Sequence, residues 1–170
     1  MAEVSRRAAR PAAKGGQRNV LFAVAAVERP PAELIGRVDL LTVTMPWGSL
    51  LRGVLALDER AAAGIASLLR PAGELMAIVS VTERDALDVP GVETEAFADG
   101  LARRWASHGL RIDAFEAAGV EDILATGSSW ARRLSAGRSR PAWRLRAICT
   151  TNAGVVGGQK PPADARRRPR

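Results

Sequence analysis

Short apolar runs alternate with segments of helical periodicity in the first half of the chain. Residues 20–26, 38–45 and 75–81 are almost continuously apolar, as is typical of strands buried on both faces. Between the second and third runs, residues 58–69 have apolar positions at helical spacing, and Asp58 is a suitable N-cap. Strands separated by helix-length segments predict a parallel sheet with crossover helices.

The second half of the chain has a different pattern. Residues 93–107 predict a helix with one apolar face, and residues 120–125 predict a shorter one. Residues 110–115 and 142–150 alternate apolar and polar positions, which indicates half-exposed antiparallel strands. The apolar face of the longer helix consists of Phe97, Leu101 and Trp105. The predicted fold class is therefore α/β, with antiparallel strands at the carboxyl-terminal end.

Composition divides the chain into three parts. Residues 1–18 are rich in Ala, Arg and Gly and predict a basic arm or short helix. Residues 19–150 hold the apolar patterns and predict the folded domain. Residues 151–170 contain paired glycines, paired prolines and three consecutive arginines, which is typical of a disordered basic tail.

Charge and cysteine usage narrow the function classes. The net charge of +7 indicates an anionic partner, most simply a nucleic acid. A single cysteine, Cys149, excludes an intramolecular disulfide and fits a reducing compartment. The one histidine, His108, has no cluster of Cys or carboxylates around it, so we expect no metal site. No run reaches the length that a bilayer requires, so we expect no membrane insertion.

Trp47 stands between Pro46 and Gly48, directly after an apolar run. Ligands bind at the carboxyl ends of strands in open α/β sheets, so this loop is a candidate ligand wall. The alternative is that the indole fills the core.

A second aromatic loop contains Ser128, Ser129 and Trp130, and arginines follow it closely. Two facing indoles would form a slot for a flat aromatic ring, and a nucleobase stacks well on such a surface. The arginines would bind phosphates, although an arginine cluster also suits a merely solvated surface. These arginines are Arg132, Arg133, Arg138 and Arg140.

The segments Met45–Leu51 and Ser128–Leu134, together with the spaced arginines Arg138 and Arg140, resemble one known family. It comprises the aminoglycoside-resistance methyltransferases that modify N1 of a decoding-site adenine in small-subunit rRNA. The similarity extends from about Ala13 to Ala147. It implies a class I methyltransferase fold, S-adenosylmethionine as methyl donor, and the small ribosomal subunit as partner of a cytoplasmic monomer.

The resemblance also implies roles for individual residues. Trp47 and Trp130 would sandwich the flipped adenine beside Ser128, and the arginines Arg133, Arg138 and Arg140, with neighbouring Arg132, would grip the rRNA. The adenosine part of the cofactor would contact Val27 and Glu28. Its methionine part would contact the loop from Thr44 to Ser49. The residues implied to contact the cofactor are Val27, Glu28, Thr44, Met45, Pro46, Trp47, Gly48, Ser49, Ser128, Ser129 and Trp130. Val27 stands where the family usually has Ala.

The front of the chain departs from the family. The family's first strand, its Asp/Gly-rich cofactor loop and the acidic second strand have no counterpart here. Either the sequence is a fragment or a mis-started reading frame, or residues 1–26 pack in a way that differs from the family, and we expect the fragment. Activity of the fragment is one hypothesis, and a non-catalytic RNA-binding remnant is the alternative. A basic nucleoid-type binder without sequence preference is a third hypothesis.

Overall fold

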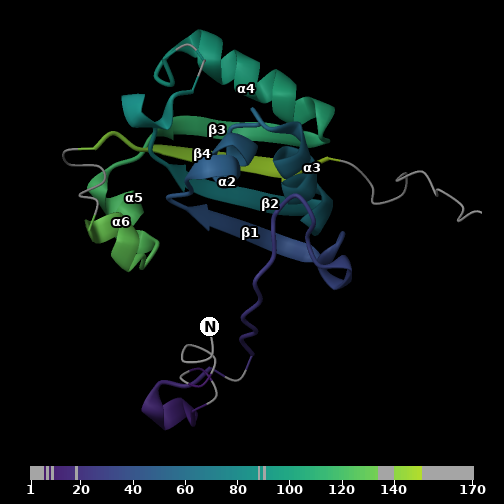
Figure 1. Cartoon of the computed structure of the whole chain (residues 1–170), viewed down its shortest axis with the longest axis vertical. Helices are drawn as coiled ribbons and strands as arrows, with labels where there is room; N and C mark the ends of the chain where they lie inside the picture. The colour runs from purple at the N-terminus through teal and green to yellow at the C-terminus, as the bar shows by residue number, and fades with distance from the viewer. Residues whose placement is uncertain are drawn as a thin grey trace, which may run out of the picture.

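The computed structural model describes residues 6, 8, 10–17, 19–87, 89, 91–133 and 140–150. Four strands form one sheet in the order β1-β2-β4-β3 (Figure 1). The strands are β1 (Val38–Thr44), β2 (Leu69–Val79), β3 (Leu110–Ala117) and β4 (Trp143–Cys149). The mixed α/β class predicted from the sequence is confirmed.

The described sheet has three strands in one direction and a single reversed strand, β4. β1 runs parallel to β2, and Val43 lies opposite Ala77. β4 is antiparallel to both of its neighbours, and Leu145 lies opposite Ala77. β3 follows β2 through α4 and therefore runs in the same direction as β1 and β2, whereas β4 is inserted between β2 and β3 in the reverse direction.

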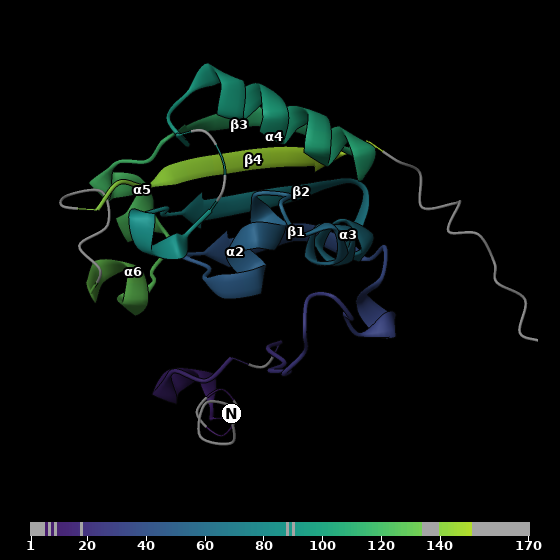
Figure 2. The same cartoon turned by 45° about the horizontal axis from the view of Figure 1, so that its top comes forward.

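Three helices cover one face of this sheet (Figures 1 and 2). They are α2 (Gly48–Val54), α3 (Glu59–Leu68) and α4 (Glu95–Ser107). The Asp58 side chain accepts a hydrogen bond from the Ala61 N–H at 3.0 Å and starts α3 as predicted. Thr94 caps α4 in the same way, through the Phe97 N–H at 3.2 Å. The described residues also contain three short 3₁₀ turns, namely η1 (Ala12–Lys14), η2 (Ala32–Leu34) and η3 (Glu83–Asp85), of which η1 lies away from the sheet (Figure 1).

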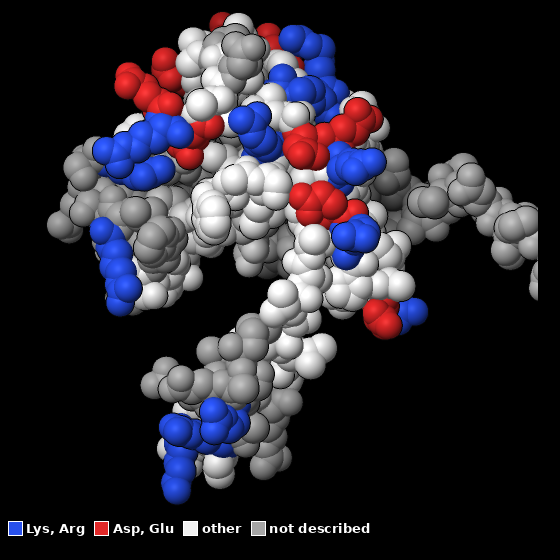
Figure 3. Space-filling view, viewed as in Figure 1, with Lys and Arg blue, Asp and Glu red and all other residues white. Residues whose placement is uncertain are grey.

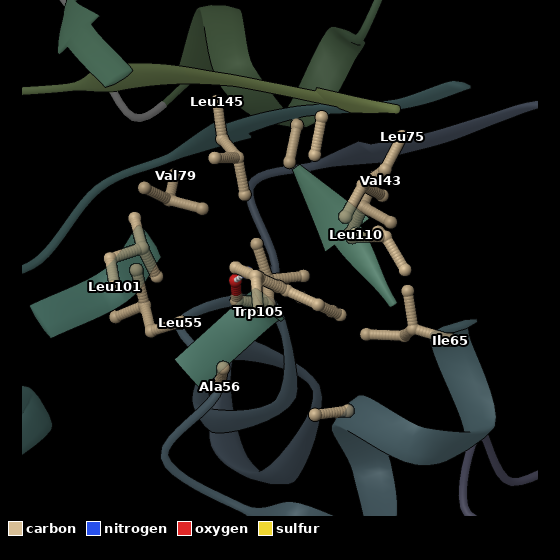
Figure 4. Packing of buried hydrophobic residues seen from close by; sticks show 14 of the residues in the cluster. Val43, Leu55, Ala56, Ile65, Leu75, Val79, Leu101, Trp105, Leu110 and Leu145 are labelled. Carbon is tan, nitrogen blue, oxygen red and sulfur yellow. Dashed lines mark hydrogen bonds between the residues drawn. The ribbon is translucent and has the colours of Figure 1, made fainter. Parts of the chain in front are cut away.

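The main core lies between these helices and the sheet. Phe97, Leu101 and Trp105 are almost completely buried, as their helical spacing predicted. Figure 4 shows Trp105 among side chains from the helices and the strands, including Leu145 of β4. Cys149 is also buried, as expected of a small core residue.

Two further helices lie at the end of the sheet where β1 and β2 finish (Figure 2). They are α5 (Val120–Ala125) and α6 (Ser129–Arg133). α5 has the predicted bounds, whereas the segment containing Trp130 was expected to be a loop and is a short helix.

The opposite face of the sheet is partly open, and residues 20–26 do not form the predicted strand. Leu40 and Met76 point to this face and keep 51% and 37% of their surface exposed. Residues 20–26 extend away from the sheet, with Leu21 91% exposed and Val24 84% exposed. An apolar run becomes a strand only where a neighbouring strand accepts its hydrogen bonds, and among the described residues β1 pairs with β2 alone.

The start of β2 also differs from the prediction. Pro71 and Gly73 are residue types that commonly follow a helix end, but α3 ends at Leu68 and both residues lie within β2, which begins at once. The register shifts between Leu69 and Glu74, and Ala72 has a φ of 60°. Both residues therefore belong to an irregular strand start rather than to a helix end.

Some predictions fall outside the described residues. These are the tail at residues 151–170, most of the arm before residue 10, and Arg138. For Trp130 and Arg132 the structure describes their place in α6 but not their side chains.

Candidate adenine-binding site

The loop after β1 holds Trp47 at the surface. The Met45 N–H donates to the Ile78 carbonyl oxygen at 2.7 Å, and the left-handed φ of Met45, 51°, turns the chain away from the sheet. Gly48 also has a left-handed φ, 61°, and α2 starts there. The Trp47 side chain is 80% exposed. It therefore does not fill the core, and it is available to stack on a flat ligand.

The second aromatic segment is fixed by its own turn. Gly127 has a φ of 66°, and the Ser128 Oγ accepts a hydrogen bond from the Ala131 N–H at 3.2 Å. The Ser128 N–H donates in turn to the Thr126 Oγ1 at 3.2 Å. This capping places Trp130 in the first turn of α6.

The two aromatic segments meet through a small buried cluster. Met45 lies two residues before Trp47, and Ala131 directly follows Trp130. Both belong to an apolar cluster that is separate from the main core, and Ala131 is completely buried. The cluster consists of Met45, Ile78, Ala118, Ile123, Ala131 and Ala142. Packing thus brings together two motifs that are far apart in the sequence.

The predicted arginines have different environments. Arg133 is exposed at the end of α6. Figure 3 shows basic side chains beside α6, whereas basic and acidic side chains alternate over α3 and α4. Arg140 is half-buried, and its Nε donates to the Ser80 Oγ at 2.7 Å. Its Nη2 lies 3.9 Å from Asp85 Oδ2. Arg140 is therefore tied into the protein, while Arg133 is open to a phosphate.

A hollow of about 360 Å³ lies on the open face of the sheet, and sequence reasoning missed its main charged residue. Thr42 and Thr44 line it from β1, and Arg144 lines it from β4. Arg144 Nη2 and Nη1 contact Glu116 at 2.5 Å and Asp122 at 2.7 Å. The hydrogen bond with Glu116, followed by the charge of Asp122, raises the pKa of the Arg144 guanidinium. In the sequence, Arg144 was noticeable only as a polar position in the alternating strand pattern of residues 142–150.

Val27 and Glu28 lie elsewhere. Val27 packs against the main core, and its carbonyl oxygen approaches α3 so closely that a Cβ on Gly64 would be 1.8 Å from it. Glu28 lines an open hollow of about 820 Å³ beside α3. This hollow shares no lining residue with the hollow that contains Thr44. The shared cluster of Met45 and Ala131 therefore links the two aromatic segments, whereas Glu28 lines a different hollow.

In the described part of the chain, the His, Cys, Asp and Glu side chains form no group of three or more suited to holding a metal ion. None of its helices combines the length and apolarity needed to cross a bilayer.

The sheet order β1-β2-β4-β3, in which β4 alone is reversed, belongs to a class I methyltransferase fold, because the chain superposes on solved methyltransferases of that class. The family model described as NpmA: 16S rRNA (adenine(1408)-N(1))-methyltransferase matches residues 1–149. The chain belongs to this family.

Individual relatives agree with the family match. An rRNA methyltransferase of Saccharopolyspora hirsuta is 34% identical over 143 residues, covering 81% of this chain and 91% of the relative. A 16S rRNA (adenine(1408)-N(1))-methyltransferase of Streptoalloteichus hindustanus is 35% identical over 146 residues. That match covers 82% of this chain but 66% of the relative, slightly less than two thirds of its length.

Solved structures give the same result. A tryptophan-to-alanine mutant of the 16S rRNA (adenine(1408)-N(1))-methyltransferase from Catenulisporales acidiphilia, crystallised with cosubstrate SAM, has a TM-score of 0.77 at 31% identity. The match covers 92% of this chain and 73% of that one. The 16S rRNA methyltransferase KamB has a TM-score of 0.73 at 31% identity, over 89% of this chain and 72% of that one.

Proposed function

We propose that this chain transfers a methyl group from S-adenosylmethionine to N1 of a decoding-site adenine in 16S rRNA and thereby confers aminoglycoside resistance. The observation that carries the proposal is the shared burial of Met45 and Ala131 in one cluster. It supports a site in which the Trp47 loop and the Trp130 helix act together. The family match over residues 1–149 supports the identity of the reaction.

In this proposal Trp47 and Trp130 bind the target base. Stacking of a base on an aromatic side chain contributes about 1–3 kcal/mol. Extraction of the base from its stack costs a few kcal/mol. Two stacking faces roughly offset this cost, and Ser128 holds the turn beside them. The exposure of Trp47 supports this role, because the indole has no competing contact in the core.

The residues that would hold the cofactor fit it in part. The Thr44–Ser49 loop and the Ser128–Ser129 turn offer hydroxyl groups and backbone N–H groups that suit the polar methionine end of S-adenosylmethionine. Glu28 suits the adenosine hydroxyls chemically, but it lines a separate hollow. When bound, the cofactor supplies the methyl group, and the side chains of this chain orient the adenine. Positioning of this kind supplies much of the acceleration in a transfer that needs no protein nucleophile.

The RNA contacts in the proposal belong to the arginines after Trp130. Arg133, together with Arg132 and Arg138, would contact phosphates and fix the register of the rRNA. We propose that the chain acts in the cytoplasm as a monomer on the assembled small subunit. The net charge of +7 supports the attraction to such a partner.

Methylation of small subunits by the purified chain tests the proposal. The assay uses methyl-labelled S-adenosylmethionine and reverse transcription across the decoding site, where N1-methyladenine blocks base pairing and stops extension. We expect a new stop at the target adenine and no stop with Trp47→Ala. Calorimetric titration with S-adenosylmethionine is the second measurement. Binding to the subunit without cofactor binding at millimolar concentration would instead identify an RNA-binding remnant.

A further inference from the structure

Ser80 is the only buried polar side chain among the described residues, with 4% of its surface exposed. It lies just after β2, on the strand's carboxyl-terminal side. Its Oγ donates to the Pro141 carbonyl oxygen at 2.6 Å and accepts from the Arg140 Nε at 2.7 Å. One hydroxyl thus joins the end of β2 to the segment that leads into β4.

Asp85 supports the same arginine from a second side. Its Oδ2 lies 3.9 Å from Arg140 Nη2. The same oxygen accepts hydrogen bonds from the Thr82 N–H at 2.8 Å and the Thr82 Oγ1 at 2.9 Å. Hydrogen bonds within the 3₁₀ turn η3 therefore hold the Asp85 carboxylate in the orientation in which it contacts Arg140.

The anchored segment borders the adenine site. Ala142 directly follows Pro141 and is buried in the small cluster with Met45 and Ala131. Ile78, two residues before Ser80, belongs to the same cluster. A hydrogen bond at Pro141 therefore holds the chain where it enters the packing that joins the two aromatic segments.

We propose that Ser80 and Asp85 are positioning residues for methyl transfer. They hold Arg140 and Pro141, and through them they fix the cluster that sets the distance between the Trp47 loop and α6. Arg140 acts as a structural tie in this arrangement. The expected effect on methyl transfer rests on the proposed function. The contacts of Ser80 and Asp85 with Arg140 and Pro141 are a property of the fold and do not depend on it.

Three single substitutions in the full chain test this inference. Ser80→Ala removes both hydrogen bonds, Asp85→Asn weakens the ion pair, and Arg140→Lys keeps the charge but removes the guanidinium geometry. Misplacement of a reacting group by about 1 Å costs up to about 100-fold in rate, so we expect kcat on small subunits to fall about 10- to 100-fold for Ser80→Ala and Arg140→Lys. We expect little change in KM and an unchanged salt dependence of subunit binding.

A purely electrostatic role of Arg140 gives the opposite pattern. Arg140→Lys would then keep kcat, and Ser80→Ala would behave like the wild-type chain. Ser107→Ala is the matched control, because the Ser107 Oγ also donates to a carbonyl, that of Arg104 at 2.7 Å, but at the exposed end of α4. Thermal unfolding identifies variants that do not fold. If Ser80→Ala does not fold, Arg140→Lys provides the test, because it keeps the hydrogen bond between Ser80 and Pro141.

Hydrogen exchange separates this inference from the proposed function. In Ser80→Ala we expect faster amide exchange in residues 129–133 and at Ala142, with α4 unchanged, even if the wild-type chain methylates nothing. Unchanged exchange in both segments would overturn the tie, whatever the methylation assay shows. Faster exchange with an unchanged kcat in an active enzyme would overturn its role in positioning.

Discussion

The Trp105 Nε1–H donates a hydrogen bond to the Val54 carbonyl oxygen, 3.1 Å away, inside the main core. Trp105 is completely buried on α4, and Val54 is the last residue of α2. Since α2 begins directly after Trp47, this bond fixes the far end of the helix that carries the candidate stacking loop. The largest core residue thus stabilises both the fold and the support of the site.

Trp105→Phe should lower the free energy of unfolding by about 1–3 kcal/mol, because the buried Val54 carbonyl loses its hydrogen-bond donor. The smaller ring of Phe leaves a cavity, which should lower the free energy of unfolding further. Denaturant unfolding followed by circular dichroism measures the change. Trp47→Phe is the control, because this exposed position should change the stability by less than about 0.5 kcal/mol. Equal stabilities of the two variants would show that the Trp105–Val54 bond does not stabilise the fold.

Trp47→Ala should abolish methylation while leaving unfolding unchanged, since the side chain is 80% exposed. Trp130→Ala should abolish methylation in the same way. Binding to the small subunit should weaken less, because phosphate contacts supply most of the affinity. Labelled-methyl incorporation and filter binding measure the two quantities. Trp47→Phe retains a stacking surface and should keep part of the activity. Full methylation by both alanine variants would rule out a sandwich of the adenine.

Arg133→Ala should reduce the slope of log affinity against log salt by about one, the value expected for one phosphate contact. The same change is expected for Arg138→Ala. Subunit binding measured over a range of salt concentrations gives the slope. Arg103→Ala removes an equal charge from the exposed face of α4 and should leave the slope unchanged. An identical slope in all three variants would place the rRNA elsewhere on the surface.

Gly64→Ala should destabilise the chain, because its Cβ would lie 1.8 Å from the Val27 carbonyl oxygen and backbone atoms would have to move. Gly100→Ala is the matched control in another helix. There the nearest atom is the movable Arg104 Nη1 at 2.9 Å, and helix propensity favours Ala by about 0.5–1 kcal/mol. Denaturant midpoints of the two variants should therefore move in opposite directions. A stabilised Gly64→Ala would show that residue 27 does not pack on α3 in solution.

Local patterns predicted most of the fold. Asp58 and the helical spacing of Phe97, Leu101 and Trp105 predicted α3 and α4, because capping and one-sided burial leave periodic signals. Residues 20–26 show the limit of such signals, since an apolar run does not indicate whether a partner strand is present.

Prediction of the site had a similar limit. The two aromatic loops were found from their composition, but their proximity depends on Met45 and Ala131, two small or flexible apolar residues with no distinctive pattern. Arg140 was grouped with its basic neighbours, because the Ser80 hydroxyl that binds it is distant in the sequence. Long-range side-chain pairing of this kind leaves no periodic signal in a single chain.

The cluster around Met45 and Ala131 has an evolutionary consequence. A change in the length or bulk of one aromatic segment alters the volume available to the other, so we expect substitutions in the two segments to be non-additive in their effect on stability. Recombination between two relatives at a point between residues 45 and 131 would combine halves that had never been selected to pack together.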